Sequence, residues 1–324
     1  MKNYSTEDIQ ISVVIPCFNA ESTILLQLEA LENQIDPPKF EVIISNNNCT
    51  DKTVEKVMQY ARTSNLNIQI ADASAVQGIN FARNAGLAKA SAPYIMICDA
   101  DDVVGEKWLA HGLKNFSYHR IWSGSAIPIS DTEFPTDLKS ARALFDRPDK
   151  PWKRPILEQS GVFQVLMGGN FGAERKYLLH LGGFDVAAPS PGDDNELAMR
   201  VLKDGEQIPV SKDVLIGYRN RTSFEYIARS YYLGGKSHAW LATQYGVLRD
   251  SPYGNPAKNL LKTYLLLPLK YLINRKDVQW RDIVLRQQST KGFALGYLLY
   301  KVLRKQRIRR LGEGWIKEDL TSVA

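Results

Sequence analysis

Short apolar runs separated by amphipathic stretches fill the first hundred residues, and this alternation limits the fold more than any other feature. Strands are expected at residues 11–16, 40–44, 66–71 and 94–98. Helices are expected between them, at residues 21–34, 51–62 and 78–90. A continuous apolar run suits a strand that helices cover on both faces. The alternation therefore predicts an α/β fold whose doubly wound, mostly parallel sheet is flanked by helices.

Three carboxylates follow the last of these strands. Asp99, Asp101 and Asp102 come directly after the apolar run 94–98. Ligands of open α/β sheets bind beyond the carboxyl ends of the strands, and clustered carboxylates need a cation to offset their repulsion. Their oxygen atoms suit Mg²⁺ or Mn²⁺, with water and substrate phosphates as further ligands. The alternative is an acidic turn that caps the next helix, but the position after a buried strand favours the metal site.

A second acidic pair, Asp193 and Asp194, follows a Pro-Gly turn and precedes a helical pattern that begins near Glu196. The helix dipole favours acidic residues at this position, so a capping role is the structural alternative to a functional one. Upstream, residues 168–172 read as a glycine-rich loop, which is either a turn or a place where backbone approaches a ligand. Trp122 to Ile129 is a further candidate strand, and residues 223–240 form a further helix-like stretch with an expected break at Gly234 and Gly235.

Basic residues gather near the C-terminus. Residues 256–310 carry fourteen lysines and arginines against two aspartates, so the rest of this chain of net charge +6 is mildly acidic. The apolar runs at 263–273 and 292–310 are interrupted well short of the roughly 20 residues that span a bilayer. An apolar stripe beside lysine and arginine is typical of a helix on an anionic membrane surface. The alternative is a helical subdomain that packs on the rest of the chain.

The remaining composition is that of an ordinary soluble protein, with 44% hydrophobic and 23% charged residues. Cys17, Cys49 and Cys98 are widely spaced and odd in number, which implies no disulfide framework and fits a reducing cytoplasm. The first ten residues lack the apolar core of a signal peptide. We therefore expect a cytoplasmic protein, peripheral on the inner face of the membrane if the basic segment binds lipid. No nucleic-acid-binding motif accompanies the charge, so no nucleic acid is expected as a partner.

With these segments in order, the chain resembles family 2 glycosyltransferases of the GT-A fold over about residues 10–240. The resemblance is carried by VVIPCFNAE (13–21), EVIISNNNCTDKT (41–53), GINFARNAGLAKA (78–90), DADD (99–102), and GGNFGAERKYLLHLGGFD (168–185) followed by GDDNEL (192–197). It implies a GT-A nucleotide-sugar-binding and catalytic domain over residues 1–240, followed by a helical, basic extension over residues 241–324. The implied reaction is inverting, metal-dependent transfer of a sugar from a nucleotide diphosphate, with UDP expected, to a hydroxyl acceptor in polysaccharide, glycolipid or other glycoconjugate synthesis.

The resemblance also assigns roles to residues. Asp101 and Asp99 would hold the Mg²⁺ or Mn²⁺ ion, and Asp194 would be the catalytic base, with Asp193 as the second candidate. Asn170 and Gly169 would lie on the acceptor and sugar side. The residues implied to bind the donor nucleotide are Pro16, Phe18, Asn19, Glu21, Asn46, Asn48, Gly78, Arg83, Asp99 and Ala100.

Two positions depart from the family pattern. Asn46 stands where an acidic residue often contacts the base, and an amide both accepts and donates hydrogen bonds. Tyr218 stands where many members have a histidine near the metal, so the ion would depend on Asp101, the diphosphate and water.

Two other readings remain at this point. A nucleotidyltransferase also uses paired acids and Mg²⁺, but it would show a glycine-rich, basic loop after the first strand, and CFNAES (17–22) has neither. A non-catalytic module of the same fold would bind nucleotide-sugar without transfer. The retained acids Asp101 and Asp194 argue against that reading, and the departures at positions 46 and 218 leave it open.

Overall fold

The computed structural model describes residues 8–145, 151–158, 161–273, 279–305 and 307–315. At its centre is one eight-stranded sheet with the strand order β3-β2-β1-β4-β7-β6-β8-β5. The strands are β1 (Ile11–Cys17), β2 (Phe40–Asn46), β3 (Ile68–Asp72), β4 (Tyr94–Cys98), β5 (Val103–Val104), β6 (Ile121–Ser130), β7 (Asn170–Glu174) and β8 (Val210–Asn220). The sheet helices are α1 (Ile24–Glu32), α2 (Thr53–Thr63), α3 (Ile79–Lys89), α4 (Trp108–Phe116), α5 (Leu138–Ala143), α6 (Arg175–His180) and α7 (Asp193–Lys203).

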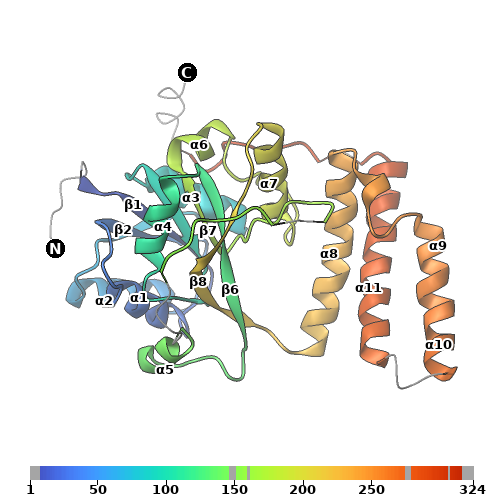
Figure 1. Cartoon of the computed structure of the whole chain (residues 1–324), viewed down its shortest axis with the longest axis horizontal. Coiled ribbons are helices and arrows are strands. Elements are labelled where there is room, and N and C mark those ends of the chain that lie inside the picture. The colour runs from blue at the N-terminus through green and yellow to red at the C-terminus, as the bar shows by residue number, and fades with distance from the viewer. Residues whose placement is uncertain (1–7, 146–150, 159–160, 274–278, 306, 316–324) are drawn as a thin grey trace.

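The first four long strands confirm the predicted doubly wound core. β2 and β4 both pair in parallel with β1, and β3 pairs in parallel with β2. β1 is buried along its whole length, because alternate side chains enter two different helical layers. Val13 and Ile15 pack with α1 and α4, whereas Val14 packs with α3, α6 and α7. Helices therefore flank both faces, as Figure 1 shows.

The second half of the sheet corrects one prediction. Part of the expected glycine-rich loop at 168–172 is the strand β7, which runs antiparallel between β4 and β6. Gly172 lies against the rings of Trp122 and Phe116, where a Cβ atom would be 2.8 Å from Cζ of Phe116. This glycine therefore serves close packing in the middle of the sheet. The candidate strand at 122–129 is confirmed as β6, which pairs in parallel with β8.

The C-terminal extension is helical, as expected. It contains α8 (Phe224–Gln244), the short 3₁₀ turn Leu248–Asp250, α9 (Pro256–Leu261), the π-helical turns η3 (Lys262–Leu266) and η4 (Leu298–Val302), α10 (Leu267–Ile273) and α11 (Trp280–Tyr297). In Figure 1 these helices stand beside the sheet as a row of rods, with α9 and α10 farthest from it. Residues 274–278 and 306 of the predicted basic segment lie outside the described residues.

Gly234 and Gly235 do not break α8, contrary to expectation, since the helix runs unbroken through both. Gly235 instead faces α11, where its missing side chain leaves room for the carbonyl oxygen of Ser289. The predicted domain boundary at residue 240 also falls within α8, and the division into two domains stays a prediction. Among the described residues, no helix has both the length and the apolar composition needed to cross a membrane.

Candidate active site

A cavity of about 560 Å³ opens at the carboxyl ends of β1 and β4, the edge at which ligands of such sheets bind. Six residues predicted to contact donor or metal line it: Pro16, Phe18, Asn19, Asp99, Ala100 and Asp101. The other lining residues were not predicted to contact a ligand: Ala20, Ser22, Thr23, Ile79, Asp131, Arg219 and Arg221. The two arginines belong to β8 and the residue after it, so their place depends on a strand that is distant in the sequence.

Several of the predicted donor residues organise the loops around this cavity. Asn19 has a positive φ of 50°, and its Oδ1 accepts a hydrogen bond of 2.8 Å from the backbone of Thr50. Oε2 of Glu21 accepts from the backbone N–H of Lys52 at 2.8 Å. These two contacts fix the loop after β1 to the start of α2.

Asparagines hold the loop after β2 in a similar way. Oδ1 of Asn46 accepts from the backbone of Cys49 at 3.1 Å, and Asn48 donates to the carbonyl of Ser74 at 3.1 Å. The buried Asn47, which was not singled out from the sequence, accepts from the backbone N–H of Gly78 at 2.7 Å. Gly78 has a φ of 143°, which glycine adopts freely, and it directly precedes α3. The chain is thereby turned into the helix that carries Arg83.

The carboxylates after β4 form an electrostatically strained group. Burial raises the pKa of Asp102 to about 8, and the negative charge of Asp99 adds to this. Burial likewise raises the pKa of Asp99, although Arg83 opposes the shift. Asp102 accepts a hydrogen bond of 2.8 Å from the backbone of Arg219, but its second oxygen is buried with no hydrogen-bond partner among the described residues. Besides burial, the negative charges of neighbouring acids raise the pKa values of Asp99 and Asp102, even though Arg83 lies 3.6 Å from Asp99 and Arg221 lies 3.6 Å from Asp101.

This arrangement fits a divalent cation. The described residues contain no cluster of three or more histidine, cysteine, aspartate or glutamate side chains that could hold a metal alone. Mg²⁺ and Mn²⁺ are commonly bound through one or two carboxylates, with substrate phosphates and water completing the coordination. Asp101 is partly exposed in the cavity, 3.6 Å from Nη2 of Arg221, and can serve as such a ligand. Tyr218 lies on β8 near these acids. Burial raises the pKa of its phenol, and the negative charges of Asp102, Asp101 and Asp99 add to this shift.

Arg83 joins the two predicted acidic clusters. Its Nη1 is 2.7 Å from Oδ2 of Asp193, and its Nη2 is 3.6 Å from Oδ1 of Asp99. The guanidinium is almost completely buried and lies over the ring of Phe184 at 5.1 Å. Asp99 and Asp193, which are far apart in the sequence, therefore contact the same guanidinium. Arg83 acts here as a bridge within the protein.

Gly168 and Gly169 allow this close approach. A Cβ atom on Gly169 would be 2.5 Å from Oδ2 of Asp99, and one on Gly168 would be 3.0 Å from Nη2 of Arg83. The backbone N–H of Gly168 also donates to Oδ2 of Asp194 at 3.3 Å. Larger side chains would push the acids apart, so these two glycines shape the site directly.

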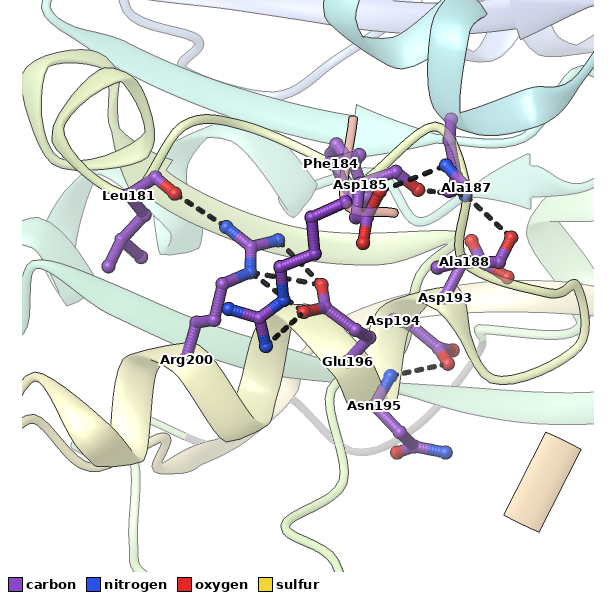
Figure 2. Close-up of polar contacts among 12 residues, drawn as sticks. Leu181, Phe184, Asp185, Ala187, Ala188, Asp193, Asp194, Asn195, Glu196 and Arg200 are labelled. Carbon is purple, nitrogen blue, oxygen red and sulfur yellow. Dashed lines mark hydrogen bonds and ion pairs between the residues drawn. The ribbon is translucent and has the colours of Figure 1, made fainter. Parts of the chain in front are cut away.

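Asp194 has the properties of a proton acceptor. Burial raises its pKa to about 6, and the charge of Asp193 adds to the shift. Asp194 lies in the first turn of α7 and accepts from the backbone of Asn195 at 2.7 Å (Figure 2). Asp193 instead accepts a hydrogen bond from Arg83. Of the two predicted candidates, Asp194 is the one without a cationic side chain in contact among the described residues. The third acid of this turn, Glu196, is fully buried and forms a bidentate pair with Arg200 (Figure 2).

Asn170 has a structural position. Its fully buried side chain accepts from Trp108 at 2.8 Å and donates to the carbonyls of Ser125 and Val214, each at 2.9 Å. These bonds connect β7 with β6, β8 and α4. The amide therefore supports the sheet under the site, and its role on the acceptor side stays a prediction.

The eight-stranded mixed sheet with its acidic groups at the strand ends defines a nucleotide-sugar transferase fold of the GT-A type. The sequence model described as glycosyl transferase family 2 matches residues 12–182, and the chain belongs to this family. A mannosyltransferase from Pyrobaculum calidifontis, solved with GDP-Man and Mn²⁺, has a TM-score of 0.61 at 19% identity over 92% of this chain and 88% of that one. Staphylococcus aureus TarS 1–349 in complex with UDP has a TM-score of 0.51 at 17% identity over 92% of this chain and 93% of that one.

Curated relatives match at low identity. A poly(ribitol-phosphate) beta-glucosyltransferase of Bacillus spizizenii is 26% identical over 168 residues, which are 48% of this chain and 26% of the relative. The poly(ribitol-phosphate) beta-N-acetylglucosaminyltransferase TarS of Staphylococcus aureus is 22% identical over 238 residues, 69% of this chain and 38% of the relative. The chain thus spans well under half the length of either relative.

Proposed function

We propose that this protein is an inverting, metal-dependent glycosyltransferase that moves a sugar from a nucleoside diphosphate donor to a hydroxyl acceptor. The observation that carries the proposal is the Arg83 bridge. The side chain of Arg83 contacts both Asp99, after β4, and Asp193, at the start of α7, so the proposed metal ligands and the proposed base lie in one region. UDP is the proposed nucleotide because of the family resemblance. The amide of Asn46 would contact the nucleobase in place of the acidic side chain that family members often have there. A TarS structure holds UDP and the mannosyltransferase holds GDP-Man, so both nucleotides occur on this fold.

The donor would lie in the cavity beyond β1 and β4. Pro16, Phe18 and Asn19 form the wall on the β1 side, and Arg219 and Arg221 supply positive charge on the β8 side. When bound, Mg²⁺ or Mn²⁺ held by Asp101 and Asp99 would neutralise negative charge on the diphosphate leaving group.

Asp194 would accept the proton of the attacking hydroxyl group. Its pKa of about 6 keeps most of the side chain ionised at neutral pH while leaving it more basic than an ordinary aspartate. The hydroxyl oxygen forms the new bond to the anomeric carbon as the bond to the diphosphate breaks. No enzyme nucleophile is interposed, so the anomeric configuration inverts.

We place this reaction on the cytoplasmic side, at an anionic membrane surface that presents a lipid-linked or polymeric acceptor. The excess of lysine and arginine in residues 256–310 supports this placement.

A panel of nucleotide-sugars tests the proposal. With Mn²⁺, the purified protein should hydrolyse one nucleotide-sugar, or transfer its sugar, far faster than it does with the others. The variant Asp194→Asn should lose this activity. Release of pyrophosphate from a sugar 1-phosphate and a nucleoside triphosphate would instead identify a nucleotidyltransferase. Donor binding without turnover, with any acceptor, would identify a binding module.

A further inference from the structure

The C-terminal helices use their inner faces for packing. α8 and α11 lie side by side (Figure 1), and Gly235, Gly292 and Gly296 leave room for backbone of the opposite helix. Phe293 of α11 is also buried. The second apolar run in the sequence covers residues 292–310. Its first residues therefore pack against α8 and are not free to contact a partner.

The segment from α9 to α10 is different. It packs on α11 through one side, where the buried Thr263 contacts Thr290 at 3.3 Å and accepts from Gln287 at 3.4 Å. Its other side exposes large apolar side chains: Leu265 is 51% exposed, Leu272 64% and Ile273 86%. The exposed set, called here the leucine ridge, comprises Leu261, Leu265, Leu266, Leu269, Leu272 and Ile273. A contiguous apolar surface of this kind marks an interaction site.

Charge indicates what covers the ridge. Lys258, Lys262 and Lys270 are exposed along the same segment, and residues 256–273 contain no aspartate or glutamate. A symmetric dimer through the ridge would bring the lysines of both copies into one interface, because a two-fold interface uses the same patch on both partners. An anionic surface would instead neutralise them.

We propose that the leucine ridge inserts into the interfacial layer of an anionic phospholipid bilayer, with the three lysines against the lipid headgroups. Apolar side chains beside lysine on a helix suit a position in the membrane plane. Trp280, the first residue of α11, is also half exposed, and tryptophan is enriched at membrane interfaces. The inference rests on the membrane placement in the proposed function and is independent of the transfer chemistry.

Vesicle flotation tests this inference with the full chain. The protein should float with phosphatidylglycerol-containing vesicles at low salt and much less with pure phosphatidylcholine. The triple variant Leu265→Ser, Leu269→Ser, Leu272→Ser should lose at least about tenfold in partitioning. Lys258→Glu, Lys262→Glu, Lys270→Glu should lose binding to anionic vesicles as well. The matched control removes three exposed apolar side chains elsewhere, Met58→Ser, Ile156→Ser and Val165→Ser, and should float like the unchanged protein.

Equal flotation of the ridge variant and the control would overturn the inference, as would failure of the unchanged protein to float. A concentration-dependent dimer that only the ridge variant loses would reassign the ridge to self-association. Hydrolysis of a nucleotide-sugar in solution should be the same in all variants. If the unchanged protein and all variants lack that activity but float as expected, the result would count against the proposed reaction. The inference that the leucine ridge binds the membrane would still hold.

Discussion

Arg83 compensates the buried charge of two acids from distant segments. Its side chain is 3% exposed, and its partner Asp193 is 7% exposed. Replacing it by methionine keeps the length of the side chain but leaves Asp193 buried without a cation. We expect Arg83→Met to lower the free energy of unfolding by about 3–5 kcal/mol in urea denaturation. Arg62→Met, on the exposed surface of α2, should change it by about 0.5 kcal/mol or less. Equal values for both variants would mean that the bridge contributes nothing to folding.

Asp194 predicts a pH dependence with a defined sign. Its pKa is raised to about 6, and only the ionised form can accept a proton, so the transfer rate should fall as the pH drops below about 6. At pH 5 the rate should be roughly tenfold below its plateau. In the variant Asp193→Asn, the fall in rate at low pH should begin at a lower pH, because the charge of Asp193 helps to raise the pKa of Asp194. Initial rates between pH 5 and 8 check both points, and a flat profile would exclude Asp194 as the base.

Asp101 predicts a loss of metal-dependent binding. Its carboxylate is partly exposed in the cavity beyond β1 and β4, so Asp101→Ala should fold normally. Calorimetric titration with the nucleotide diphosphate should show that added Mn²⁺ tightens binding to the unchanged protein but has little effect on the variant. Asp72→Ala, at the exposed end of β3, should respond to Mn²⁺ like the unchanged protein. A full Mn²⁺ response in Asp101→Ala would move the metal to other residues.

Neighbouring glycines of α8 provide a matched test at the scale of the element. A Cβ atom on Gly235 would clash with the backbone of Ser289 in α11, whereas one on Gly234 would meet nothing within 4 Å. We expect Gly235→Ala to lower the free energy of unfolding by about 1–3 kcal/mol through separation of the two helices. Gly234→Ala should be neutral or stabilising by up to about 1 kcal/mol, since alanine favours the helix. Thermal or urea unfolding would distinguish them, and identical effects would contradict close packing of α8 on α11.

Which elements the sequence predicts depends on how local their signals are. β4 is a continuous apolar run, and β1 and β2 are mostly apolar, interrupted by the buried Ser12 and Glu41. Their parallel pairing follows from the helices between them. β7 was missed because Gly172 gives it the composition of a loop, and its strand character comes from contacts with Trp122 and Phe116. Gly235 was misjudged for a similar reason: a helix–helix contact, which the local sequence does not show, determines its role.

The site follows the same pattern. Asp99, Asp101 and Asp194 stand beside recognisable elements, so the sequence marks them as candidates. The places of Arg219 and Arg221 in the cavity depend on the pairing of β8 with β6, some ninety residues earlier, so no local signal marks them. The pairing of Arg83 with Asp193 likewise joins segments more than a hundred residues apart.

At the scale of the whole molecule, the chain returns from the helical extension to the sheet. Residues 307–315 contact the loop that precedes α7: Arg310 donates its backbone N–H to Asp185 at 2.9 Å, and Arg307 donates to the carbonyl of Ala187 at 2.7 Å. Asn84 of α3, fully buried, donates to the carbonyl of Glu313 at 2.8 Å. The helical extension is therefore joined to the sheet at both ends of its sequence, before α8 and after η4.

Removal of residues 307–324 should loosen the loop before α7 and reduce both stability and transfer. We expect a loss of about 1–3 kcal/mol in the free energy of unfolding and a lower kcat, because Asp194 follows this loop. Removal of residues 316–324 alone retains each of these contacts and serves as the control. Unfolding curves and initial rates measure the two effects, and full activity in the longer deletion would show that the returning segment does not support the site.

In the proposed reaction, the Arg83 bridge has a consequence for how the protein can acquire new specificities. One guanidinium contacts Asp99, proposed to lie on the donor side, and Asp193, which precedes the proposed base, so a change beside it would alter donor affinity and proton transfer together. Altered donor preference should therefore arise more readily at cavity walls with no link to that balance, such as Ser22 and Thr23. Directed evolution towards another sugar nucleotide should accept substitutions there and reject them at position 83.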